Sequence, residues 1–195
     1  MAQGRKITVL VDVSYIDYAG PGARAFFRKF SGLPPEILIV TAFSMSKSFT
    51  MYGGRVGAMI GREFAEVNTY TSRATWSNNC RGGMACLVRI WEDPALRRQY
   101  QAEQQQYYQL IQERAAIFVK EAKAVGLPML PYQAGFFLSI PSPDSGRVCA
   151  LLQKKHIYLV PLRAGVRVAV CAIPKAKMHG LAGAIRDAMV EAGQL

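Results

Sequence analysis

The stretch SMSKSFTMYGGRVG, residues 44–57, directly follows the apolar run ILIVTAF at residues 37–43. The run is rich in β-branched residues, which predicts a buried strand of an α/β sheet, and ligands of such sheets bind where strands end. Two of its serines, a lysine, a tyrosine and an arginine lie within a dozen residues of one another: Ser44, Ser46, Lys47, Tyr52 and Arg55. Hydroxyls and a guanidinium can hold a phosphate, and a lysine amine can attack a carbonyl. The stretch is therefore a candidate binding and catalytic site, the alternative being that Lys47 is a surface lysine in a loop.

A similar strand is predicted before this stretch. KITVLVDV, at residues 6–13, is apolar and β-branched and predicts a second buried strand, which a polar, glycine-containing loop follows. Residues 23–30 are basic and aromatic and predict a short helix, and residues 58–60 predict a third, short strand. These elements place the first part of the chain in the α/β class.

Residues 94–125 predict one long helix, because apolar side chains recur there at helical spacing. Asp93 fits the N-cap, Pro94 fits the first turn and Gly126 fits the end of this helix. A helix of about 30 residues is roughly 45 Å long, more than a compact core needs, so we expect it to link two bodies. The rest of the chain predicts a small α+β unit, with strands at residues 135–140, 157–161 and 166–171 and helices at residues 145–155 and 175–191.

The composition excludes several classes of protein. With 51% hydrophobic and 19% charged residues in a length of 195, the chain is not disordered, collagen-like or a coiled-coil rod. No apolar run approaches the roughly 18–20 residues that span a bilayer. The basic start leads into an interrupted apolar stretch with no small-residue cleavage site, which predicts a strand and not a signal peptide. We therefore expect a cytoplasmic protein that has no membrane partner.

The cysteines and the charge favour neither a metal site nor a nucleic-acid partner. The four cysteines form no C-x-x-C pair, so free thiols in a reducing compartment are expected and a zinc site is not: Cys80, Cys86, Cys149 and Cys171. The formal net charge of +11 would suit nucleic acid, but the basic residues are spread along the chain and no nucleic-acid motif accompanies them. Small anionic substrates or cofactors would suit the same charge.

The pattern S-x-S-K-x-F-x-x-Y-G-x-R-x-G in the opening stretch is long and specific. It is matched by Ser44, Ser46, Lys47, Phe49, Tyr52, Gly53, Arg55 and Gly57. This pattern resembles the pyridoxal-phosphate attachment signature of class I aminotransferases, the fold type I enzymes of the aspartate and aromatic aminotransferase type. The resemblance implies that Lys47 forms the Schiff base with the cofactor, and that Ser44, Ser46 and Arg55 hold its phosphate.

The resemblance also implies roles for two residues at the end of the first predicted strand. Asp12 would pair with the pyridinium nitrogen of the cofactor, and Tyr15, three positions later, would hydrogen-bond its phenolic oxygen. A carboxylate at the ring nitrogen keeps that nitrogen protonated and makes the ring an electron sink. A turn or capping role is the alternative for Asp12.

Two arginines are implied to bind the substrate. Arg167, in GVRVAV, would grip the α-carboxylate, the alternative being a structural salt bridge, since a buried guanidinium needs an anionic partner. Arg73 precedes the Ser77-Asn78 pair at the family's spacing. As a residue of the neighbouring subunit, it would bind the side-chain carboxylate of the substrate. The family usually continues with two prolines, where this chain has Asn79 and Cys80.

The resemblance implies an enzyme that transfers the amino group of an aspartate-type or aromatic amino acid to a 2-oxo acid. Lys47 would act as Schiff-base lysine and proton shuttle, pyridoxal 5'-phosphate would be the cofactor, and the intact form would be a homodimer. Residues 1–93 would be part of the cofactor-binding large domain, with a mixed, mostly parallel sheet, and residues 94–195 the linking helix and the C-terminal small domain. Only the C-terminal half of the family's enzyme is covered. The alternative is a truncated, inactive fragment that serves as binding or assembly partner of a missing N-terminal half.

Overall fold

The computed structural model describes residues 4–61 and 65–195. The chain divides into two compact units, Met1–Gln104 and Gln105–Leu195. The boundary falls inside one long helix, α4 (Pro94–Ala124), and each unit has its own three-stranded sheet.

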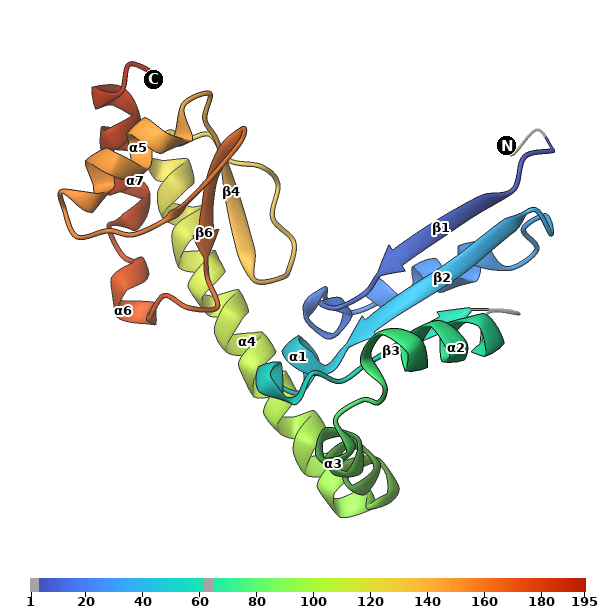
Figure 1. Ribbon diagram of the computed structural model, residues 1–195. Coiled ribbons are helices and arrows are strands. Elements are labelled where there is room, and N and C mark those ends of the chain that lie inside the picture. Colours follow the sequence, from blue (N-terminus) through green and yellow to red (C-terminus); the bar gives the residue numbers. More distant parts are fainter. Residues whose placement is uncertain (1–3, 62–64) are drawn as a thin grey trace. The chain divides into compact units, whose positions relative to one another are not determined.

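The sheet of the first unit is formed by β1 (Ile7–Asp12), β2 (Ile37–Ser44) and β3 (Gly57–Gly61), in that order (Figure 1). β1 runs parallel to β2, whereas β3 runs antiparallel to β2, so the sheet is mixed. Two 3-10 helices connect β1 to β2: η1 (Ile16–Tyr18) and η2 (Ala23–Phe30). Because β1 and β2 are parallel, the residues that follow both strands lie at the same edge of the sheet.

The prediction that β1 is buried is wrong. Leu10 of β1 is 65% exposed, whereas Val40 of the central strand β2 is only 3% exposed. β1 is an edge strand of the described sheet and pairs with β2 alone. The apolar composition of a strand measures its tendency to be buried, and it does not reveal which element covers the strand.

The remaining elements of the first unit are helical. α1 (Met45–Ser48) follows β2 without a gap, and η3 (Tyr52–Gly54) precedes β3. Two longer helices were not predicted from the sequence: α2 (Ala65–Trp76) and α3 (Arg81–Glu92). Their composition explains the omission, because threonine, serine and asparagine in α2 and two glycines in the first turn of α3 are weak helix formers.

The helix predicted at residues 94–125 is confirmed as α4. Asp93 caps it, since its Oδ1 accepts hydrogen bonds from the backbone amides of Ala95 and Leu96 at 2.8 and 3.2 Å. Gly126 ends it with φ at 69°, a left-handed conformation that glycine adopts without steric cost. One face of the helix is buried, with residues at spacings of three and four: Ile111, Ala115, Phe118 and Ala122.

The second unit packs helices on one face of an antiparallel sheet. The strand order is β4 (Phe137–Pro141), β6 (Gly165–Ala169), β5 (Val160–Leu162), and α5 (Ser145–Gln153) lies between β4 and β5 in the chain. Cross-strand partners of β4 and β6 share the core face and are fully or almost fully buried: Leu138 with Val168, and Ile140 with Val166. The opposite face carries Ser139 paired with Arg167. Alternation along β6 therefore separates Arg167 from the apolar core.

The predicted C-terminal helix at residues 175–191 is interrupted. It consists of α6 (Lys175–Met178) and α7 (Leu181–Glu191), and Gly180 between them has φ at 78°. At this break, Glu121 of α4 accepts a hydrogen bond from the Gly180 amide at 2.8 Å. β5 begins three residues later than the predicted strand at residues 157–161.

Gly57 is the first residue of β3, and its close approach to β2 leads to a stability prediction. A Cβ at this position would lie 2.6 Å from the Phe43 carbonyl oxygen, which belongs to the strand ladder and cannot withdraw easily. We expect Gly57→Ala to lower the free energy of unfolding by about 1–3 kcal/mol, measured by urea titration. Gly53→Ala is the matched control, because a Cβ there would meet nothing within 4 Å. Equal effects of the two substitutions would contradict the prediction.

Candidate functional site

Lys47 lies on a single helical turn at the end of the central strand. Ser44 ends β2 and is the N-cap of α1, with its Oγ accepting a hydrogen bond from the Ser46 amide at 3.2 Å. Met45, Ser46 and Ser48 are buried on this turn, and Lys47 is half-buried. The capping serine thus converts the extended strand into a helical turn and fixes where the lysine leaves the backbone.

Two tyrosine rings flank the amine of Lys47. Its Nζ lies 4.0 Å from the centroid of the Tyr52 ring and 5.5 Å from the centroid of the Tyr15 ring. Tyr15 follows β1, and Tyr52 begins η3. Three segments therefore converge on the amine, and the electron-rich ring faces favour a cation at this position.

Asp12 ends β1, three residues before Tyr15. The amide and the hydroxyl of Ser14 both donate to Asp12 Oδ1, at 2.9 and 2.5 Å. The hydroxyl bond has the larger effect and the amide bond the smaller one. Together they hold the pKa of the Asp12 carboxyl below its usual value, although desolvation by burial acts to raise it. Asp12 and Tyr15 line an open cavity of about 410 Å³ together with Phe26 of η2, and this volume lies within the range of small-molecule sites.

The Ser14 hydroxyl should therefore control the titration of Asp12. A carboxyl with a lowered folded-state pKa stabilises the fold above its unfolded pKa, and this contribution is lost as the pH falls through the folded pKa. We expect Ser14→Ala to raise the pKa of Asp12 toward its usual value and to weaken the fold's dependence on pH below about 4. Titration of the Asp12 carboxyl by NMR measures this shift. Ser14→Thr keeps the hydroxyl and should leave the pKa low; a raised pKa in both variants would argue against the assignment.

Arg55 follows η3 and has a left-handed backbone conformation, with φ at 47°. Its guanidinium Nη1 donates to the Tyr52 carbonyl oxygen at 2.8 Å, and the side chain is exposed. This contact joins the two ends of the short segment from Tyr52 to Arg55. Arg55 thereby belongs to the same local structure as the Tyr52 ring that flanks the amine.

Arg167 belongs to the second unit and lies on the face of β6 away from its core. Its guanidinium carbon is 4.5 Å from the centroid of the Phe137 ring. Its Nε is shielded from solvent and has no hydrogen-bond partner among the described residues. A shielded donor of this kind costs free energy until an acceptor reaches it, which fits an anion-binding role.

Arg73 is exposed on α2 of the first unit. Among the described residues, Arg73 has no hydrogen bond or ion pair, whereas Arg55 donates to the Tyr52 carbonyl. The sequence indicates Tyr52 only as part of a pattern. In the structure its ring lies nearer to the Lys47 amine than the Tyr15 ring does. Tyr100, which contacts the turn of Lys47 from 52 residues away, carries no sequence signal that could have revealed it.

Comparison with known proteins places these features in a family. The profile described as "Aminotransferase class I and II" matches residues 1–185, and the chain therefore belongs to this family. No curated protein is significantly similar to the chain. None of the described helices has both the length and the apolar character that crossing a membrane requires.

Solved structures agree with the family. An aminotransferase from Anaerococcus prevotii is 36% identical, with a TM-score of 0.89, over 94% of this chain and 47% of that one. An aromatic-amino-acid aminotransferase from Burkholderia pseudomallei, covalently bound to pyridoxal phosphate, is 24% identical with a TM-score of 0.73, over 96% and 49%. A Thermus thermophilus aspartate aminotransferase double mutant is 16% identical with a TM-score of 0.72, over 93% and 48%. The last two show a shared fold, and the expected fold type I architecture is confirmed. The chain spans about half the length of the structures it matches.

Proposed function

We propose that this chain carries the catalytic lysine of a pyridoxal-phosphate-dependent aminotransferase, and that the lysine is Lys47. The observation that carries the proposal is the position of the Lys47 amine against the Tyr15 and Tyr52 rings, at the edge of the sheet where β1 and β2 end. Membership of the aminotransferase family supports the reaction class.

The chemistry of the surrounding side chains fits this cofactor. The lowered pKa of Asp12 keeps a carboxylate available for a protonated ring nitrogen, and the phenol of Tyr15 can donate to the ring's phenolic oxygen. The hydroxyls of Ser44 and Ser46 and the guanidinium of Arg55 would hold the phosphate. When bound, pyridoxal phosphate supplies an electron-withdrawing ring that stabilises negative charge at the substrate α-carbon. Lys47 Nζ would be the base that removes the proton from this carbon, and it would hold that proton until the transfer is complete.

Two arginines would recognise the substrate. The shielded Nε of Arg167, which has no hydrogen-bond partner in the part of the chain that the structure describes, supports binding of the α-carboxylate of an amino acid or a 2-oxo acid. Arg73 of one subunit would bind the side-chain carboxylate of an aspartate-type substrate in the site of the other subunit. The protein would be a homodimer in the cytoplasm, and aromatic amino acids are the other substrate class. In this arrangement residues 1–93 belong to the cofactor domain and residues 94–195 to the linking helix and small domain.

Reduction with borohydride tests the proposal directly. The purified chain is incubated with pyridoxal phosphate, reduced, digested and mapped by mass spectrometry. We expect the reduced cofactor on Lys47, because a positioned amine adds to the aldehyde far more readily than a free one. Modification spread over several exposed lysines, or absent from Lys47, would contradict the proposal and would favour a chain that acts only as a binding or assembly partner.

A further inference from the structure

The turn that carries Lys47 cannot maintain its geometry alone. α1 has four residues, whereas isolated helices are marginal even at about 12–15 residues. Its last carbonyl groups have no partner within the helix. Ser44 satisfies the start of the turn, and the amides of Phe49 and Thr50 donate to the carbonyls of Met45 and Lys47. The carbonyl of Ser48, the last residue of the turn, is left to contacts from elsewhere in the first unit.

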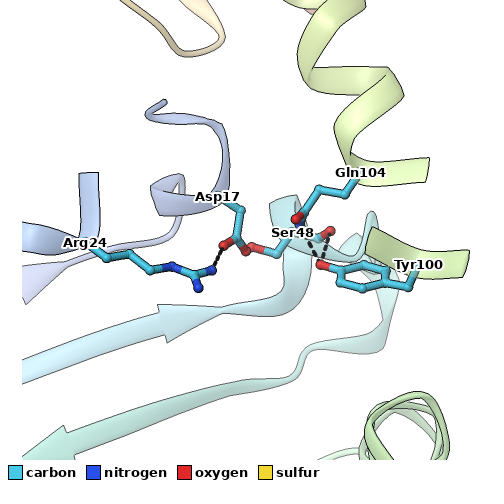
Figure 2. Close-up of polar contacts among 5 residues, drawn as sticks. All are labelled: Asp17, Arg24, Ser48, Tyr100 and Gln104. Atoms are coloured by element: carbon cyan, nitrogen blue, oxygen red, sulfur yellow. Dashed lines mark hydrogen bonds and ion pairs between the residues drawn. The ribbon is translucent and has the colours of Figure 1, made fainter. Parts of the chain in front are cut away.

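Tyr100, near the start of α4, supplies these contacts (Figure 2). Its Oη donates to the Ser48 carbonyl oxygen at 3.0 Å. Its ring stacks on Phe49, with centroids 4.4 Å apart and planes 6° from parallel. Tyr100 therefore holds both residues that directly follow Lys47.

The hydroxyl of Tyr100 is itself oriented by Gln104, one turn further along α4. Gln104 Nε2 donates to Tyr100 Oη at 2.6 Å, as Figure 2 shows. An amide nitrogen can only donate, so it occupies a lone pair of the hydroxyl and leaves the hydroxyl proton for the Ser48 carbonyl. The pKa of Tyr100 lies well above its ordinary value. Burial of the phenol is the larger cause, and the charge of nearby Asp17 is the next. The phenol therefore keeps its proton, while Asp17 forms an ion pair with Arg24.

We propose that Tyr100 is a positioning residue that sets the direction of Lys47 by fixing the end of α1. The inference rests on the proposed function of Lys47, because a positioned amine has value only if it reacts. Ser44 at one end and Tyr100 at the other then restrain the turn, and Lys47 leaves it between these two restraints. Small displacements of a reacting group reduce rates strongly, so the effect of Tyr100 should appear in the reaction of Lys47.

Hydrogen exchange tests the restraint without any cofactor. The amides of Phe49 and Thr50 donate to the carbonyls of Met45 and Lys47. We expect Tyr100→Phe, which keeps the stacked ring, to make both amides exchange about two- to tenfold faster, the factor for losing one hydrogen bond of typical strength. Gln104→Leu should act in the same direction, because it leaves the phenol proton undirected. Tyr107→Phe is the control, a tyrosine of the same helix that is 57% exposed. Unchanged exchange in Tyr100→Phe overturns the inference.

A second readout separates positioning from a general loss of structure. Tyr100→Phe should lower the rate at which pyridoxal phosphate and borohydride label Lys47 by a similar factor, while acetic anhydride, which needs no orientation, should label Lys47 at the wild-type rate. A parallel fall with both reagents would indicate a merely structural role and overturn the inference. If the wild-type chain is not labelled at Lys47 at all, the proposed function fails, and the exchange rates of Phe49 and Thr50 still decide whether Tyr100 restrains the turn.

Discussion

Replacement of Lys47 by alanine is expected to abolish the absorption band that pyridoxal phosphate forms when it is linked to the chain. The amine at the end of β2 lies 4.0 Å from the centroid of the Tyr52 ring and 5.5 Å from that of the Tyr15 ring. Loss of the nucleophile removes the covalent step entirely, because no neighbouring hydroxyl can replace an amine in condensing with an aldehyde. The measurement is an absorption spectrum of each variant with added cofactor.

The control for this prediction is Lys29→Ala. Lys29 is an exposed lysine in η2 of the same unit, so its loss changes the net charge equally without touching the turn of Lys47. The free energy of unfolding should change by less than about 0.5 kcal/mol in the control, as for most surface substitutions. A band that persists in Lys47→Ala, or that disappears in Lys29→Ala, would refute the assignment of the site.

The second large effect is expected for Phe118→Ala. Phe118 is fully buried on the face of α4 that lines the core of the second unit. Removal of a buried phenyl group leaves a cavity and should lower the free energy of unfolding by about 3–5 kcal/mol. Urea unfolding followed by circular dichroism measures the loss.

Tyr107→Ala is the matched variant for this comparison. Tyr107 lies on the same helix and is 57% exposed, so truncation removes an aromatic ring without opening a cavity. We expect a change within about 0.5 kcal/mol. If the two substitutions had similar effects, α4 would not be held by the contacts of its buried face.

Sequence patterns were sufficient where one local signal dominates. The 31 residues of α4 have a capping Asp93, a terminal Gly126 and a continuous apolar stripe, and the helix was predicted almost to the residue. β1 and β2 were likewise located, because β-branched runs persist over six to eight residues. α2 and α3 were missed, because weak helix formers occupy them and only tertiary contacts stabilise such segments.

The candidate site was predictable only in part for a related reason. Ser44, Lys47 and Arg55 belong to one short pattern, and Asp12 and Tyr15 to a second pattern at the parallel strand end. The contact between Tyr100 and Ser48 joins residues 52 positions apart, and no local periodicity encodes it. The Ser14 hydroxyl bond that lowers the pKa of Asp12 depends on the turn after β1, which composition alone does not specify.

The position of β1 at the margin of its sheet makes its backbone a built-in reporter. Alternate amide groups of an edge strand have no hydrogen-bond acceptor in the sheet, so their protons exchange with solvent almost as in a free peptide. Any polypeptide that added a strand beside β1 would slow exchange at these amides first, before it altered the signals of β2 or β3. Isotope labelling of this one strand would therefore detect such an addition in an unfractionated mixture.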